Sequence, residues 1–302
     1  MEAAGRPPRR LEYVVTPQRA GQKVDTLLRK ELGLSGTVIR RVKWLPDGIL
    51  LDGARVFTSQ PARAGQVLSV LVADPGSRSG IPPVEGPLDI VYEDEDLLVL
   101  DKAPGVTVHP GPGHWDDTLG NFLMAYYEKQ GIQADFHPVH RLDKGTSGLM
   151  VVAKHAHAQE LLKRQLHTEA FRRGYLAVCE GRPQPERGVV DAPIGPVEGS
   201  LIARQVRPDG LAARTRYEVL RGGDGRSLVQ LELETGRTHQ IRVHMAHIGC
   251  PLTGDFLYGV EDKTLIGRPA LHSAVLEIDQ PVTGERLAFR SEMPEDMARL
   301  IG

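Results

Sequence analysis

The sequence lacks several features that define other classes of protein. Its 302 residues contain two cysteines, Cys179 and Cys250, which form neither a metal-binding pattern nor a disulfide framework. No run of eighteen apolar residues is present, so we expect no membrane span. The N-terminal residues contain no apolar signal core, so we expect no export. A reduced, cytoplasmic compartment fits these absences best.

Charge is nearly balanced over the whole chain but is unevenly distributed along it. The formal net charge is −2. Residues 1–73 contain 12 Lys and Arg against 6 Asp and Glu, a net charge of +6, so the remainder carries −8. A basic segment on an acidic body suggests that a polyanion binds mainly to the N-terminal part.

The length and a change in composition predict two domains. Residues 74–85 are rich in Pro, Gly and Ser and show little periodicity, which is typical of a linker. We therefore expect a small domain over residues 11–73 and a large domain over residues 86–302. The first ten residues are expected to be a loose basic arm.

The N-terminal segment has the pattern of two helices and a small hairpin. Apolar residues follow helical spacing over residues 24–32, and Ser35 can cap a second helix over residues 37–45. Residues 49–56 and 67–72 are expected to form short strands. The second helix carries three cations that could bind a phosphate backbone, namely Arg40, Arg41 and Lys43. A solvated basic helix face explains them equally well.

The remainder of the chain alternates between strand-like and helical patterns. Strands are expected at residues 88–92, 97–101, 149–153, 173–180, 217–220, 228–233, 271–278 and 286–289. Helices are expected at residues 118–127, 158–170 and 238–248. Several hairpins with few strand–helix–strand crossovers favour an α+β fold with a mostly antiparallel mixed sheet.

The run from His140 to Gly148 contains the first group with possible chemistry. It places Asp143 in a polar, glycine-containing turn directly before the apolar strand 149–153, between the cations Arg141 and Lys144. A carboxylate held at the end of a sheet beside cations is suited to catalysis. The alternative is a β-turn whose Asp bonds backbone amides, and these nine residues alone leave both interpretations open.

A second motif runs from Thr235 to His244. We expect a strand to end near Gly236 and a helix to begin with Thr238 as its cap. His239 and Arg242 lie three residues apart and so share one face of that helix. The alternative is a solvated surface for these polar side chains.

Together these segments resemble the family of pseudouridine synthases that modify ribosomal large-subunit RNA and some transfer RNA. The matching segments lie in order between about residues 88 and 298, and they are DKAPGVTVHPGPG, HRLDKGTSGLMVVAK, RRGYLAV, TGRTHQIRVHMAHIGCPLTGDFLYG and ALHSAVLEIDQPVTGERLAF. Residues 11–73 resemble the small RNA-binding domain named after the fourth protein of the small ribosomal subunit, through KVDTLLRKELG, GILLDGARV and AGQVLSVLV.

The resemblance implies conversion of uridine to pseudouridine, which needs a carboxylate at the sugar or the ring but no redox step, cofactor or metal. It implies that Asp143 is the nucleophile, or a base that starts the reaction through C1′ or C2′. It implies that Arg242 pairs with Asp143, and that Tyr175 packs against the uracil and helps remove the C5 proton. From its strand pattern alone, Tyr175 is an ordinary strand tyrosine.

The same resemblance implies that RNA contacts surround this site. The target uridine leaves its stack, and Arg141 is carried over as the side chain that fills the vacated position. The alternative for Arg141 is a phosphate contact. Lys102 and Arg237 are further candidates for phosphate contact.

Three other functions compete with this interpretation. A metal hydrolase is conceivable because two clusters have metal-ligand residue types, His137, His140 and Asp143, and His239, His244 and His247. Pro138 interrupts the first cluster, and no His-Glu-x-x-His motif is present. The other two are a catalytically silent RNA-binding or ribosome-assembly protein and a transfer-RNA pseudouridine synthase. We expect a monomer that acts on RNA, with ribosomal RNA as the leading substrate.

Overall fold

The structure is a computed structural model that describes residues 7–74, 79–223 and 225–302. Its helices are α1 (Val24–Lys30), α2 (Gly36–Val42), α3 (Leu119–Gln130), α4 (Ala156–Gln165), α5 (Gln240–His247) and α6 (Glu295–Ala298), with a 3-10 turn at Pro17–Arg19. The N-terminal strands are β1 (Arg10–Val14), β2 (Ile49–Leu51), β3 (Ala54–Arg55) and β4 (Val67–Leu71). The remaining strands are β5 (Ile90–Glu93), β6 (Leu97–Lys102), β7 (His137–Pro138), β8 (Ser147–Ala153), β9 (Phe171–Glu180), β10 (Arg187–Asp191), β11 (Ile194–Pro196), β12 (Arg204–Val206), β13 (Arg214–Gly223), β14 (Arg226–Leu233), β15 (Leu271–Asp279) and β16 (Arg286–Arg290).

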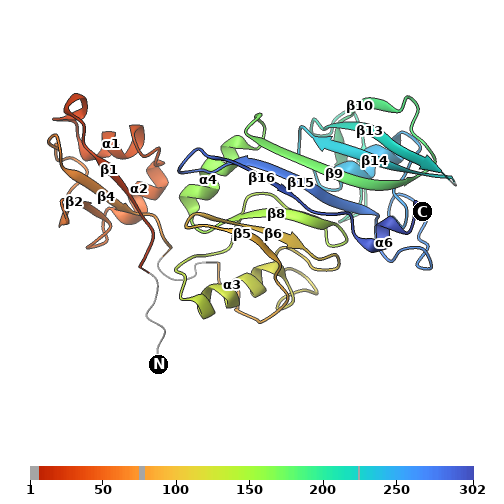
Figure 1. Ribbon diagram of the computed structural model, residues 1–302, viewed down its shortest axis with the longest axis horizontal. Helices are drawn as coiled ribbons and strands as arrows, with labels where there is room; N and C mark the ends of the chain where they lie inside the picture. Colours follow the sequence, from red (N-terminus) through yellow and green to blue (C-terminus); the bar gives the residue numbers. More distant parts are fainter. Residues whose placement is uncertain (1–6, 75–78, 224) are drawn as a thin grey trace.

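The N-terminal part is a four-stranded antiparallel sheet, in the order β1-β4-β2-β3, with α1 and α2 beside it (Figure 1). Val24, Leu27 and Leu28 of α1 are fully buried, as their helical spacing predicts. Ser35 caps α2 by accepting a hydrogen bond from the N–H of Val38, which confirms the predicted cap. The strands over residues 49–56 and 67–72 are present as predicted, and both helices are present but end earlier than predicted, at Lys30 and Val42, so that Lys43 lies just after α2.

The prediction of a loose arm over the first ten residues is wrong where the structure describes them. Arg10 begins β1, which pairs with β4, and the Arg10 guanidinium donates to the carbonyl of Asp47. Arg9 donates two hydrogen bonds, of 2.9 and 3.1 Å, to the carboxylate of Asp96 in the larger part. The segment was missed because a single edge strand shows its pattern only against its partner. Residues 1–6 lie outside the described residues.

Ionic contacts join the N-terminal part to the larger body. Asp74 is buried and accepts from Arg41 of α2 and from His137 Nε2, the latter at 2.6 Å. Arg41 also donates to the carbonyl of Val72 at 3.0 Å. The prediction that Arg41 contacts RNA is therefore wrong, because its side chain is 12% exposed and both terminal nitrogens already donate to Asp74 and Val72.

The larger part is built on a ten-stranded mixed sheet. Its main path runs β10-β13-β14-β9-β15-β8-β6-β5, with β16 beside β15 and β7 beside β8. Every pairing is antiparallel except that of β15 with β8, which is parallel. The predicted α+β fold with a mostly antiparallel mixed sheet is confirmed, whereas β10 and the separate β11-β12 pair were not predicted.

Strand β8 lies at the centre of this sheet and is buried on both faces. Met150 and Val152 pack into the core under α3, and Leu149 and Val151 pack into the core under α4. Figure 1 shows these two helices on opposite sides of the sheet. Each such buried side chain contributes about 1.5–3 kcal/mol, so β8 is a rigid support for the turn that precedes it. The helix predicted over residues 158–170 instead ends at Gln165, because β9 begins at Phe171.

Candidate active site

Asp143 lies in the turn that leads into β8. The turn is closed by a 3.0 Å hydrogen bond from the N–H of Thr146 to the carbonyl of Asp143. Gly148 follows with φ +105°, and a Cβ there would lie 2.3 Å from the carbonyl oxygen of Ser273. Only glycine fits this crossing of β8 and β15. The hydrogen bond and the close crossing at Gly148 therefore fix the turn, and with it the backbone of Asp143, relative to the sheet.

The carboxylate of Asp143 accepts no hydrogen bond from any residue that the structure describes. Its nearest basic groups are Arg242, with Nη1 at 3.6 Å from Oδ2, and His239, with Nε2 at 4.0 Å from Oδ2. The structure thus contradicts the alternative in which this Asp bonds the amides of its own turn. The acid is 29% exposed at its side chain, ionically flanked and open to a ligand.

The beginning of α5 supplies both of these neighbours. His239 precedes the helix with φ 57°, so the prediction that it shares a helix face with Arg242 is wrong, although both side chains lie near Asp143. The predicted cap at Thr238 is wrong, because His239 occupies the cap position. The Gln240 amide oxygen instead accepts from the Arg237 N–H and the Thr235 hydroxyl. Burial lowers the pKa of His239, which favours its neutral form.

Asp255 holds Arg242 in place and was given no role in the sequence analysis. Its carboxylate accepts from Nε and Nη2 of Arg242, both at 2.7 Å, and the two side chains are 0% and 4% exposed. Burial disfavours the charged guanidinium, but Asp255 and Asp143 outweigh this and raise the pKa of Arg242. The only sequence signal was a Gly-Asp pair in an aperiodic loop, and such a pair also occurs in ordinary turns.

Aromatic rings of the same loop enclose the Arg242 guanidinium. Its Cζ lies 5.6 Å from the ring centre of Phe256 and 5.1 Å from that of Tyr258. The Tyr258 hydroxyl is also 2.8 Å from Nδ1 of His239. The loop therefore fixes both neighbours of Asp143.

Tyr175 comes from β9, and its side chain is buried beside Ser273 of β15. Burial raises its pKa, so the phenol is protonated at neutral pH. Tyr175, Asp143 and Arg242 line one small hollow of about 50 Å³, together with Arg141 and Arg237. The structure thus brings together residues that lie up to 101 positions apart in the sequence, from Arg141 to Arg242.

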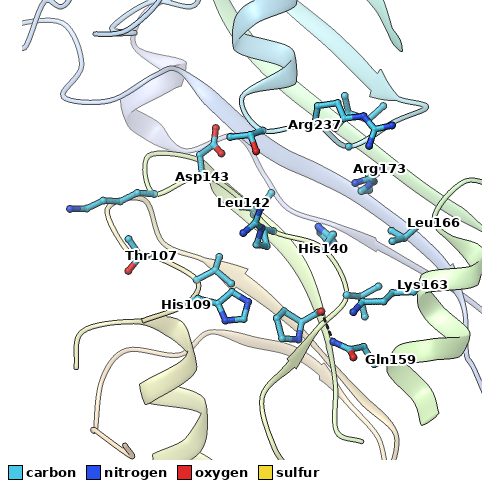
Figure 2. Close-up of a pocket in the computed structure, with 18 of the residues that line it drawn as sticks. Thr107, His109, His140, Leu142, Asp143, Gln159, Lys163, Leu166, Arg173 and Arg237 are labelled. Carbon is cyan, nitrogen blue, oxygen red and sulfur yellow. Dashed lines mark hydrogen bonds between the residues drawn. The ribbon is translucent and has the colours of Figure 1, made fainter. Parts of the chain in front are cut away.

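A larger cleft of about 830 Å³ adjoins this hollow (Figure 2). Five of its lining residues are Lys or Arg, namely Arg141, Lys144, Lys163, Arg173 and Arg237. Asp143 is the single carboxylate among the described residues that line it. A basic cleft with one acid on a domain of net negative charge attracts a polyanion to the position of that acid.

The remaining predicted RNA contacts differ in accessibility. Arg141 is exposed at the cleft, and Arg237 is half-buried there and donates to the carbonyl of Ala212. Arg40 is exposed on α2, and Lys43 is half-buried with its Nζ 4.9 Å from the Trp44 ring centre. All four remain available to a ligand.

The prediction that Lys102 contacts phosphate is wrong. Its side chain is 2% exposed, and Nζ donates to the backbone carbonyls of Ala103, Val106 and Lys144. It joins the end of β6 to the Asp143 turn and so has a structural role.

The two histidine clusters do not converge on a common point. His137 bonds Asp74, while His244 bonds Thr215 and the carbonyl of Ala192. In the part of the chain that the structure describes, no three His, Cys, Asp or Glu side chains could together hold a metal ion. Within the same residues, no helix is long and apolar enough to cross a membrane.

Comparison with known proteins gives this site its class. The family model for RNA pseudouridylate synthases matches residues 96–247, a range that includes Asp143, Tyr175 and Arg242. The chain belongs to the RNA pseudouridylate synthase family, and it is an RNA pseudouridine synthase, as the resemblance implied.

The similarity extends over nearly the full length of individual proteins. The chain is 39% identical to the uncharacterized RNA pseudouridine synthase YlyB of Bacillus subtilis, covering 96% of this chain and 97% of that protein. It is 39% identical to ribosomal large subunit pseudouridine synthase D of Pseudomonas aeruginosa, over 93% and 91% of the two chains. The solved structure of human RNA pseudouridylate synthase domain containing 1 matches 70% of this chain and 85% of that chain, with TM-score 0.57 and 29% identity.

Proposed function

We propose that this enzyme isomerises specific uridines of large-subunit ribosomal RNA, as a cytoplasmic protein. Several relatives that match nearly the whole chain are named ribosomal large subunit pseudouridine synthase D, which supports this substrate. The observation that carries the chemistry is the Asp143 carboxylate, which is free of hydrogen bonds from described residues and lies in a basic cleft beside Arg242 and Tyr175.

In this proposal the reaction starts at Asp143. The N1–C1′ bond breaks, the uracil rotates, C5 joins C1′, and the C5 proton leaves. The carboxylate attacks C1′ as a nucleophile or removes a proton at C2′, and both routes need an ionised, unencumbered oxygen. Arg242 Nη1, at 3.6 Å, places a positive charge beside the Asp143 carboxylate without covering its oxygen by a short hydrogen bond.

Tyr175 and Arg141 act on the base in the same proposal. The ring of Tyr175 lies in the hollow with Asp143 and offers a stacking face, and its hydroxyl takes part in moving the C5 proton. The uridine must leave its stack to reach the buried end of the cleft. Arg141 is exposed at the entrance and fills the vacated position.

Loss of the Asp143 charge tests the chemical assignment. An unmodified large-subunit ribosomal RNA transcript with tritium at uridine C5 releases tritium as pseudouridine forms. We expect Asp143→Asn to abolish release while the dissociation constant for the same RNA stays nearly unchanged. Asp209→Asn, at an exposed acid paired with Arg207, is the matched control and should keep full turnover. Turnover in the Asp143 variant would refute the assignment.

The same assay tests the substrate. A transfer-RNA transcript that is modified while the large-subunit transcript is not would overturn the ribosomal assignment. A protein that binds both transcripts and modifies neither would support the catalytically silent alternative.

We also propose that residues 11–73 are an RNA-binding domain that uses Arg40 and Lys43. The net charge of +6 over residues 1–73 and the accessibility of these two side chains support the proposal. Replacing both with Gln should lower the slope of log affinity against log salt by about 1 to 2. An unchanged slope would contradict it.

A further inference from the structure

Arg173 is a buried cation that has no counter-ion among the residues that the structure describes. It lies on β9 two residues before Tyr175, so both side chains point to the cleft side of the strand. It is 5% exposed, and its side chain makes no ion pair or hydrogen bond with any described residue. Its Nε is completely buried without a partner. By contrast, Arg172 faces the other side and pairs with Glu232 and Glu277 at 3.2 and 3.3 Å.

Among the described residues, no carboxylate forms an ion pair with Arg173. Its guanidinium lies 5.7 Å from the ring centre of Phe171, and a Cβ at Gly236 would lie 3.2 Å from Nη1. Burial, together with the charge of Arg173, lowers the pKa of His140 to about 3, so this neighbour is neutral. Figure 2 shows Arg173 and Arg237 close to each other on one side of the cleft and Asp143 apart from them.

An unpaired buried charge is costly, commonly by several kcal/mol, so such a group is retained where a ligand supplies the counter-charge. The guanidinium presents parallel N–H donors that match two oxygens of a phosphate. The second cation, Arg237, lines the same cleft and strengthens the attraction for an anion there.

We propose that Arg173 binds a backbone phosphodiester of the RNA, adjacent to the nucleotide that enters the Asp143 site. The inference rests on the proposed function for the identity of the RNA. The Arg173–phosphate contact positions the strand so that a neighbouring nucleotide can enter the Asp143 site, which lines the same cleft. Arg173 is therefore a positioning residue, and the chemistry stays with Asp143.

Thermal unfolding of the protein without RNA tests whether Arg173 lacks a counter-ion in the folded state. Met keeps the apolar stem of Arg173 and removes its charge, so Arg173→Met should leave the thermal midpoint unchanged or raise it. Arg172→Met is the matched control, because it removes a cation that is paired and should leave the midpoint unchanged or lower it. A clear fall in the midpoint of the Arg173 variant would show that the cation already stabilises the fold, which contradicts the inference.

RNA binding tests the phosphate contact itself. Affinity for the unmodified large-subunit ribosomal RNA transcript is measured against salt in the Asp143→Asn background, where no turnover occurs. We expect Arg173→Met to weaken binding and to lower the log–log slope by about 0.7 to 0.9, the value for one phosphate contact. Arg173→Lys should keep the slope, and Arg172→Met should change neither slope nor affinity. Weaker binding with an unchanged slope would indicate a neutral RNA group and would overturn the proposal.

The outcomes separate this inference from the proposed function. An unchanged slope in a protein that makes pseudouridine refutes the role of Arg173 alone. A reduced slope in a protein that never releases tritium refutes the proposed function and retains the phosphate contact.

Discussion

Replacement of Asp255 by Asn should destabilise the protein strongly, although Asp255 is outside the sequence-derived site. Asn keeps the shape and the oxygen that accepts from the N–H groups of Leu257 and Tyr258, so the main loss is the charge opposite Arg242. Breaking a pair this buried costs about 3–5 kcal/mol. Arg242 retains Asp143 at 3.6 Å as a partial substitute, so we expect the lower end, about 3 kcal/mol.

Urea and thermal unfolding measure this loss. For a protein of this size, about 3 kcal/mol lowers the thermal midpoint by about 6–12 °C. Asp209→Asn, which breaks an exposed pair, should change stability by less than about 0.5 kcal/mol. Tritium release should also fall in Asp255→Asn, because Arg242 is then free to close on Asp143 and cover its oxygen.

A double-mutant cycle decides whether the loss comes from this ion pair. Arg242→Met removes the cation. In that variant, Asp255→Asn should therefore destabilise the protein much less than it does alone, with a coupling energy of about 2–3 kcal/mol. A loss below about 1 kcal/mol in the single variant, or additive effects in the cycle, would refute the reasoning.

Three further predictions follow from buried groups of the site. Tyr175→Phe should lower tritium release about 100-fold with little change in RNA affinity; loss of affinity with unchanged turnover at saturation would contradict the role of the hydroxyl. The pKa of His140 is lowered to about 3 by burial and by a nearby guanidinium. At a pH between this value and the ordinary histidine pKa, His140 is therefore protonated in the unfolded chain but neutral in the folded chain. The free energy of unfolding should therefore fall as pH drops, and His140 should account for about 2 kcal/mol of the fall between pH 7 and pH 5. Urea unfolding midpoints should show that His140→Gln removes this contribution. The same pH dependence in the native protein and the variant would contradict the prediction. Gly148→Ala places a Cβ 2.3 Å from a carbonyl oxygen at φ +105° and should cost about 3 kcal/mol or more in thermal unfolding; a near-native midpoint would show that the crossing of the strands can relax.

Local pattern was sufficient for much of the fold. The helical spacing that starts at Val24, the Ser35 cap and the apolar run 149–153 all correspond to elements of the structure. The parallel pairing of β15 with β8 was not predictable, because strand neighbours 125 residues apart are chosen by the whole sheet. The edge strand β1 and the short β11-β12 pair were missed for the same reason, since they form only against their partners.

The sequence by itself determined the family, the residue types of the site and the turn that carries Asp143, because ordered motifs and turn chemistry are local properties of the chain. Only the tertiary structure decided which cations remain free. Lys102, Arg41 and Arg173 all carry one positive charge. Lys102 donates to backbone carbonyls and Arg41 pairs with Asp74, whereas no described residue accepts a hydrogen bond from Arg173. The partner of a long cationic side chain is set by what packs around its end, and those neighbours come from distant parts of the chain.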